Sequence, residues 1–293
     1  MDNKKLGIIK AAAIAVICFS MAVAGYLFYE HRNYKEPVVV SENCTAVKKL
    51  SDYSDVIKGT VNDCNVYIFD SGVEGGTFLI WGGTHPEEPT GVMTANLMVE
   101  NMKVTQGKVI IIDRLNTSGS TNSRVGEAYP RYFTYQTNWG TKVWRFGDRQ
   151  ANQLDSWPDP EVYIHYPSGQ NLANVDIRNA NRNWPGKVDG LLTERTAYAV
   201  MRLIEAEGVD MTLDMHEAEL EYTVENTIVT HEKGNDVAAM VSMMLTAQTF
   251  DVPVGMEFSP KALHGLSHRE IGDYSNAASY LVEVAEPLLD RIR

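Results

Sequence analysis

Short apolar runs alternate along the chain with longer segments of helical periodicity, which is typical of an α/β protein. The apolar runs predict buried strands over residues 66–69, 77–81, 108–113 and 209–215. The periodic segments predict helices over residues 90–102, 191–207 and 236–250. Because 293 residues suffice for one large domain, this alternation predicts a single α/β domain of two to three layers.

The helix predicted over residues 236–250 has one apolar face. The side chains on that face are Val237, Met240, Val241, Met244 and Leu245. We expect this face to pack in the core rather than to form a binding surface, because such a stripe is the usual buried side of a helix.

Residues 116–174 have no long periodic segment and are rich in Ser, Thr, Asn, Gly, Pro, Tyr and Trp. Loops of that length are usually functional or disordered. The aromatic content predicts an ordered segment that shapes a substrate cleft. The alternative is a packed structural excursion with no substrate contact.

The first 29 residues differ in pattern from the rest. Lys4, Lys5 and Lys10 precede an uncharged run over residues 11–29, which indicates a signal sequence or a membrane anchor. Residues 22–24 would serve as a cleavage site, but the run is close to the length that spans a bilayer. We favour an uncleaved anchor with cytoplasmic lysines over secretion after cleavage, and both predict an exported domain.

Residues 30–60 are polar and mixed, and they are predicted to form a juxtamembrane linker before a domain over residues 61–293. The net charge of −12 and the lack of a basic stripe argue against nucleic acid as a partner. Cys44 and Cys64 would lie in an oxidising compartment, where disulfides form. The sequence leaves open whether these two cysteines pair, because it does not show the distance between them.

Residues suited to metal chemistry follow two of the predicted strands. The strand at 77–81 leads to His85 and Glu88, and the strand at 209–215 leads to His216. Ligands of open α/β sheets bind at the carboxyl ends of strands. Two histidines and one glutamate form a usual shell of a catalytic zinc with an open position. We therefore predict one Zn²⁺ per chain, with Asp214 as a candidate hydrogen-bond partner behind a ligand.

Four segments in this order resemble the motifs of the zinc carboxypeptidase superfamily, and most closely those of its succinylglutamate desuccinylase/aspartoacylase branch. The segments are residues 82–88, 179–186, 213–217 and 279–283, and the resemblance spans about residues 78–286. It implies a carboxypeptidase-like fold, with a mixed central sheet of about eight strands, helices on both faces and zinc at the carboxyl edge.

The second segment implies a substrate-binding pair, Asn181 and Arg182. A guanidinium binds a carboxylate through two parallel hydrogen bonds, and in the family this pair grips a substrate carboxylate. The family often has an aspartate where this chain has Asn179. A further arginine of the family steadies the oxyanion, and Arg149 is the first candidate for it, ahead of Arg178, which adjoins the substrate-binding pair.

The last segment implies that Glu283 is the general base. This glutamate lies in an apolar strand pattern over residues 280–284, where burial raises the pKa of a carboxylate and lets it accept a proton from water. The family pattern favours Glu283 over Glu286, which lies three residues further along. The alternative is that Glu283 faces solvent on an edge strand.

Together these features predict a zinc-dependent hydrolase that cleaves an amide bond in a small molecule or short peptide with a free carboxylate. The motifs favour an N-acyl amino acid deacylase. Export favours a metallocarboxypeptidase that acts on peptides or cell-wall peptides. A non-catalytic, membrane-tethered binding module that keeps the fold is the third alternative, and it predicts failed zinc binding or a misplaced Glu283.

Overall fold

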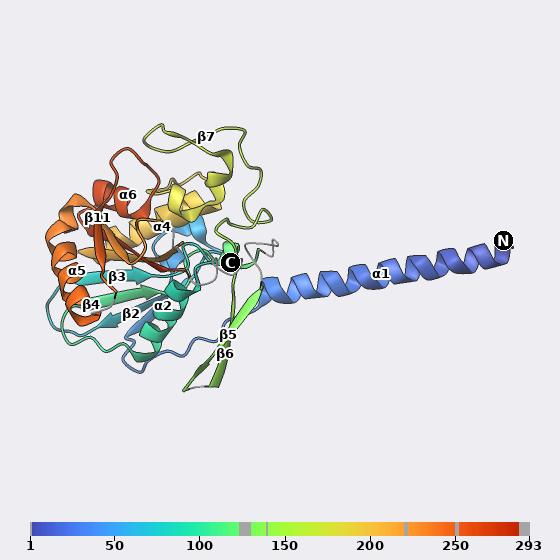
Figure 1. Ribbon diagram of the computed structural model, residues 1–293, viewed down its shortest axis with the longest axis horizontal. Helices are drawn as coiled ribbons and strands as arrows, with labels where there is room; N and C mark the ends of the chain where they lie inside the picture. Colours follow the sequence, from blue (N-terminus) through green and yellow to red (C-terminus); the bar gives the residue numbers. More distant parts are fainter. Residues whose placement is uncertain (1, 123–129, 139, 220–221, 250–251, 287–293) are drawn as a thin grey trace.

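The computed structural model describes residues 2–122, 130–138, 140–219, 222–249 and 252–286. Its centre is an eight-stranded mixed sheet with the order β1-β2-β4-β3-β9-β12-β10-β11 (Figure 1). The strands are β1 (Ala46–Lys49), β2 (Asn65–Asp70), β3 (Thr77–Trp81), β4 (Lys108–Ile112), β9 (Met211–Ala218), β10 (Thr227–Thr230), β11 (Gly255–Phe258) and β12 (Ala278–Ala285). The four central strands β4, β3, β9 and β12 run parallel to one another.

Helices cover both faces of this sheet. The α-helices are α1 (Asn3–Asn33), α2 (Pro89–Asn101), α3 (Thr117–Ser120), α4 (Leu192–Glu207), α5 (Asn235–Thr249) and α6 (Ser267–Tyr274). The 3₁₀ helices are η1 (Leu50–Asp52), η2 (Asp55–Ile57), η3 (Asn174–Arg178), η4 (Ala180–Arg182) and η5 (Glu232–Gly234). This arrangement confirms the predicted α/β class with a mixed sheet of about eight strands.

Alternating strand residues divide between two cores, because successive side chains of a strand point to opposite faces. Leu79 and Trp81 of β3 pack with Leu203 of α4 and Ile271 of α6. Ile80, between them in sequence, packs on the other face with residues of α2. The side chains of the candidate active site lie on the face of the sheet that carries α4 and α6.

The predicted elements agree with the structure, with one informative difference. Strand β9 continues through His216 to Ala218 instead of ending before His216. The extension exists because β12 pairs with β9 in parallel register as far as Ala285 opposite Ala218. That pairing lies more than sixty residues away in sequence, so the local pattern does not reveal it.

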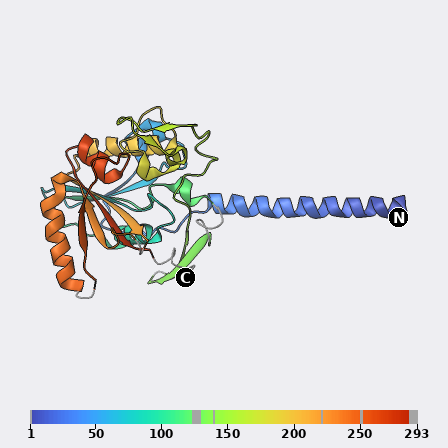
Figure 2. The ribbon, with the colours of Figure 1, turned by 45° about the horizontal axis from the view of Figure 1, so that its top comes forward.

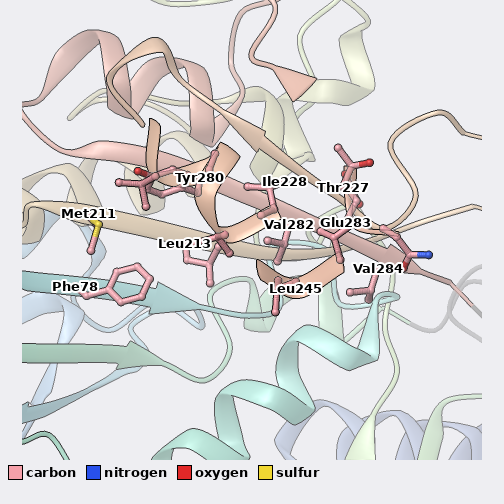
Figure 3. A pocket seen from close by; sticks show the side chains of 15 residues that line it. Phe78, Met211, Leu213, Thr227, Ile228, Leu245, Tyr280, Val282, Glu283 and Val284 are labelled. Carbon is pink, nitrogen blue, oxygen red and sulfur yellow. The ribbon is translucent and has the colours of Figure 1, made fainter. Parts of the chain in front are cut away.

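The prediction that the apolar stripe of α5 is buried was wrong for four of its five side chains, and only Val241 packs against the core. Met240 and Met244 are 51% and 54% exposed, and Val237 and Leu245 are also exposed. Between α5 and the sheet lies an apolar cavity of about 500 Å³, lined by Phe78, Leu213, Val282 and their neighbours (Figure 3). Ala238 is the fully buried contact of α5 in this layer, so the helix packs on the sheet through small side chains.

The segment 116–174 contains more regular structure than its sequence indicates. It forms the hairpin of β5 (Tyr132–Thr137) and β6 (Gly140–Arg145) and the short pair of β7 (Tyr163–Ile164) and β8 (Asn171–Leu172). Two of its aromatic residues, Tyr129 and Trp139, fall outside the described residues. The alternating pattern of the hairpin is masked in sequence because both of its faces carry polar side chains.

The N-terminal helix α1 projects from the domain as a single rod in both views (Figures 1 and 2). It is long and apolar enough to cross a membrane, and the apolar part is not buried against the domain. At its domain end, Arg32 pairs with Asp155, and Glu36 pairs with Arg114 and Arg145. The segment predicted as a linker is thus bonded to the domain, and it also contains β1.

Cys44 and Cys64 are free thiols. They precede β1 and β2, which are antiparallel neighbours with Ala46 opposite Ile68 and Lys49 opposite Asn65. The two cysteines therefore lie at opposite ends of the strand pair, roughly 20 Å apart at the rise of an antiparallel strand. That separation excludes a disulfide between them.

Candidate active site

The first potential metal ligands lie on the turn that joins β3 to α2. The N–H of Glu88 donates to the carbonyl of His85 at 3.1 Å, so both side chains leave the same turn. A Cβ atom on Gly82 would lie 2.2 Å from the carbonyl oxygen of Gly91. This close approach brings the first turn of α2 against the end of β3 and fixes Glu88 beside the sheet.

The second histidine, His216, lies on β9 next to β3 in the sheet. Asp214 points to the same face, because it is two residues away on the strand. Asp214 is fully buried and accepts hydrogen bonds from Thr84 Oγ1 at 2.7 Å and Ser267 Oγ at 2.6 Å. Its Oδ2 lies 3.0 Å from Nε2 of His216, a close charge contact without hydrogen-bond geometry.

His85, Glu88 and His216 converge with their ligand atoms within 4.8 Å of one another. Nδ1 of His85 lies 2.7 Å from Glu88 Oε1, and Nδ1 of His216 lies 2.8 Å from Glu88 Oε2. Nε2 of His85 lies 2.8 Å from Oδ1 of Asn179. This amide oxygen also accepts from the N–H of Asn181, so Nε2 of His85 is the protonated ring nitrogen.

This arrangement fits a divalent metal ion. Because His85 is protonated at Nε2, the lone pair of its Nδ1 faces the carboxylate of Glu88. Two electron-rich groups at this distance repel each other, and a cation between them would remove the repulsion. The Asp214 carboxylate beside Nε2 of His216 favours the same tautomer there. Metal-binding histidines normally donate their second ring N–H to a carboxylate or carbonyl in this way.

Burial and mutual charge set the ionisation of these groups. Burial alone would raise the pKa of Glu88, but His85 and His216 outweigh it and hold that pKa well below its ordinary value. Burial lowers the pKa of His85. Burial would also lower the pKa of His216, but Asp214 and Glu88 raise it well above normal. The cluster therefore keeps its glutamate ionised, as a metal ligand has to be.

Glu283 lies beside this cluster. On β12 it is the register partner of His216 on β9, and on its other side it faces Thr227 of β10. It therefore lies on an interior strand, not on an edge strand. Burial raises the pKa of Glu283 to about 7, and its Oε2 is buried without a hydrogen-bond partner. A carboxylate in that state is suited to accept a proton near neutral pH.

The structure brings three more of the predicted residues to the same place. Asn181, Arg182 and Arg149 line a cleft of about 430 Å³ together with His85, Glu88, His216 and Glu283. The carboxamide Oδ1 of Asn181 accepts from the N–H of Ser267 at 2.8 Å. Arg182 uses Nη1 to donate to the carbonyl of Asn181, and burial lowers its pKa.

Arg149 and Arg178 differ in their surroundings. Arg149 donates from Nε to Glu87 at 2.8 Å and lies 3.7 Å from Glu88, so it borders the cluster. Arg178 is 6% exposed, and it donates to Asp159 and to the carbonyl of Ala151. It is not among the residues that line the cleft, so the structure does not bring it to the metal ligands.

Several residues of the site were not predicted, and Glu286 was considered only as the alternative to Glu283. Asn179, noted in the sequence only as a departure from the family pattern, is the hydrogen-bond partner of His85. Glu217 and Glu286 line the cleft with buried oxygens that have no partner. Burial raises the pKa of Glu217 to about 7 and that of Glu286 to about 9. His268 also lines the cleft, and burial lowers its pKa to about 3.

Sequence spacing offers little signal for these residues. Glu217 follows His216 on the strand and would be expected on the opposite face, and His268 lies in no motif that the sequence offers. The aromatic side chains of segment 116–174 are likewise absent from the described lining of the cleft, to which that segment contributes Arg149. The larger apolar cavity beneath α5 carries no such group of converging polar atoms, so the cleft is the candidate active site.

Comparison with solved structures shows the class of fold. The metallo-carboxypeptidase from Burkholderia cenocepacia aligns with a TM-score of 0.50 at 14% identity, over 83% of this chain and 56% of that chain. An aspartoacylase family protein from Mesorhizobium loti aligns with a TM-score of 0.42 at 19% identity, over 75% and 55%. The murein-tripeptide amidase from Escherichia coli O157 aligns with a TM-score of 0.46 at 13% identity, over 89% and 88%.

The chain therefore has a metallo-carboxypeptidase-like fold, as its sequence motifs implied. It spans a little over half the length of the first two of these proteins, 55% and 56%. No protein-family model matches the sequence, and no curated protein sequence matches it.

Proposed function

We propose that this protein is a zinc-dependent hydrolase that cleaves an amide bond in a substrate with a free carboxylate, in the manner of an N-acyl amino acid deacylase. The observation that carries the proposal is the placement of His85, Glu88 and His216 in one cleft with Glu283. The three ligands and a carboxylate with a pKa of about 7 are the minimum that metal-assisted hydrolysis needs.

A zinc ion held by the three ligands supplies a Lewis acid and lowers the pKa of a water molecule. Glu283 accepts the proton of the attacking water and later delivers it to the leaving amine. Its position next to His216 in the β9–β12 register puts that proton transfer directly beside the ligands. Arg149, at the border of the cluster, stabilises the negative charge that develops on the scissile carbonyl oxygen.

Arg182 and Asn181 bind the substrate carboxylate in this proposal. Arg182 has no ion pair among the described residues, since its Nη1 donates to a main-chain carbonyl and no carboxylate lies within bonding distance. A guanidinium that lines a cleft without an anionic partner is suited to bind one from solution. Arg149, in contrast, already forms an ion pair with the carboxylate of Glu87. We therefore assign substrate-carboxylate binding to Arg182 and not to Arg149.

The second candidate is an exported metallocarboxypeptidase that acts on peptides or cell-wall peptides. Helix α1 favours it, because a hydrolase of intracellular acyl amino acids has no need of a membrane anchor. We propose that α1 anchors the domain on the outer side of a membrane. A non-catalytic binding module is the third candidate, and the intact ligand set beside Glu283 argues against it.

The test is a substrate panel with the full-length protein in detergent, loaded with zinc. N-acyl amino acids and short peptides are compared, each with a free and with an amidated carboxylate. Hydrolysis of the free acyl amino acids supports the first candidate, and hydrolysis of the peptides alone supports the second. Equal rates for free and amidated forms would contradict the role of Arg182. If no substrate is hydrolysed while zinc is bound, both enzyme candidates are contradicted and the non-catalytic binding module is the remaining candidate.

A further inference from the structure

A second group of two histidines and one glutamate lies outside the candidate active site. His165 follows β7 in segment 116–174, His264 lies in the loop before α6, and Glu270 lies in the first turn of α6. One ligand atom of each comes within 4.8 Å of the other two. The rings of His165 and His264 are stacked, with centroids 5.9 Å apart.

Glu270 is the reason to expect a cation here. It is fully buried, and its Oε2 has no hydrogen-bond partner. Its Oε1 accepts from the N–H of Gly265 at 3.0 Å and lies 2.8 Å from Nδ1 of His264. Within the described part of the chain no lysine or arginine pairs with it. A buried carboxylate with one oxygen unsatisfied and no permanent cation is costly, and a metal ion would remove that cost.

His165 has the tautomer that a metal ligand requires. Its Nε2 lies 2.6 Å from the carbonyl oxygen of Trp184, and because a carbonyl only accepts, this nitrogen carries the proton. Nδ1 therefore presents a lone pair, which the hydroxyl of Ser168 meets at 2.7 Å. A histidine that donates to a main-chain carbonyl and offers its other nitrogen is the usual arrangement behind a metal ion.

We propose that His165, His264 and Glu270 form a second divalent-metal site, with zinc as the preferred ion. Two imidazoles and one carboxylate are the ligand types that zinc accepts in tetrahedral sites. Water takes the fourth position, on the side of His264, whose side chain is 28% exposed. The proposal does not depend on the function assigned to the first cluster, since the two groups share no residue.

A metal ion at this site would link two segments that lie next to the cleft. It joins segment 116–174 to the loop before α6, which contributes Leu263 and Leu266 to the cleft. The same loop packs on the substrate-binding pair, because a Cβ atom on Gly265 would lie 2.3 Å from the carbonyl oxygen of Arg182. A metal ion here therefore holds one wall of the cleft against Arg182.

The test is the zinc content of the full-length protein in detergent, dialysed against buffered free zinc and measured by atomic emission. We expect two zinc ions per chain in the wild type, one in His85→Ala/His216→Ala, and one in His264→Ala. Glu270→Gln, which keeps the shape of the side chain, should also bind one. Ser168→Ala is the control and should bind two, since Ser168 is not among the ligands.

Thermal unfolding provides a readout that is independent of activity. In the His85→Ala/His216→Ala variant the second site alone remains, so added zinc should still raise Tm. The increase should disappear when Glu270→Gln is added. A zinc content unchanged by both His264→Ala and Glu270→Gln, or no increase in Tm on adding zinc to His85→Ala/His216→Ala, would overturn the proposal.

Discussion

Two clusters of the same composition, two histidines and one glutamate, are held in this chain in different ways. His85, Glu88 and His216 lie at the ends of central strands, and the side chains of Asn179 and Asp214 lie beside their outer ring nitrogens. His165, His264 and Glu270 lie on loops and a short helix, and a main-chain carbonyl holds one ring. The first cluster opens into a cleft, whereas the second lies where segment 116–174 meets the loop before α6 and the first turn of α6, with His264 28% exposed.

The two clusters have the same ligands but differ in the charged residues that surround them. Next to the first lie Glu283, Glu286 and Glu217, each with a raised pKa, and two arginines. Within the described residues no further carboxylate or guanidinium is paired with the second cluster. The comparison teaches that a ligand set indicates a metal, and that the groups able to move protons and bind substrate indicate catalysis.

The largest expected effect comes from removing one histidine of each cluster. His85→Ala should lower kcat/KM by about 10⁴-fold or more, because the Lewis acid and the activated water are both lost. His264→Ala should raise KM several-fold and leave kcat nearly unchanged, because it alters only a wall of the cleft. Steady-state kinetics on the best substrate of the panel measure both. If kcat falls as much in His264→Ala as in His85→Ala, the distinction between a catalytic first cluster and a structural second cluster is contradicted.

The next effect concerns the proton acceptor that only the first cluster possesses. Glu283→Gln should lower kcat by about 10³-fold while zinc content stays unchanged, because general-base catalysis is lost and the ligands are intact. Glu257→Gln is the matched control, since Glu257 also lines the cleft but is exposed on β11. Full activity of Glu283→Gln with zinc bound would refute the assigned role.

A smaller effect is expected from the side chain behind His85. Asn179→Ala removes the acceptor of the His85 ring N–H and should weaken zinc binding at the first cluster by about 10–100-fold. The second cluster should keep its affinity and so serves as an internal control in a competition titration with a chelator. Equal weakening at both sites would indicate a general loss of structure instead.

The smallest effect is on stability. Burial and neighbouring glutamates raise the pKa of Glu286 to about 9, so the folded state holds a proton that the unfolded state releases above about pH 4.5. Stability is therefore lost as pH rises from 4.5 towards 9. In metal-free protein, Glu286→Gln should raise Tm by about 2–4 °C at pH 8, and by less at pH 5. Thermal unfolding monitored by circular dichroism checks this, and a Tm that falls at pH 8 would contradict it.

The sequence predicted those parts of the molecule that depend on local pattern. Strand β3 and helix α4 lie where apolar runs and helical periodicity place them. The turn at His85 was also predictable, because residues three apart share a turn. The convergence of His216 and Glu283 was available only through the family resemblance, since their contact is a parallel register between strands far apart in sequence.

Features that depend on tertiary packing were not predictable. The exposed Met240 and Met244 of α5 have the spacing of a buried stripe, and spacing does not report how closely a helix approaches the sheet. The second cluster joins residues about one hundred positions apart, His165 and His264, with no strand to indicate their meeting. Asn179 was noticed only as an exception, although its oxygen is the hydrogen-bond partner of His85.

The junction of α1 with the domain has a consequence for where the proposed hydrolase would work. Arg32, in the last turn of α1, bonds to Asp155, and Tyr34, directly after α1, donates to the carbonyl of Val143. The whole of α1 is about 46 Å long at the rise of an α-helix. In the anchored state that we propose, the lack of a free spacer would keep the mouth of the cleft at one height and one angle above the lipid. Substrates would then have to lie within a thin layer next to the bilayer, and those anchored elsewhere in the envelope would stay out of reach.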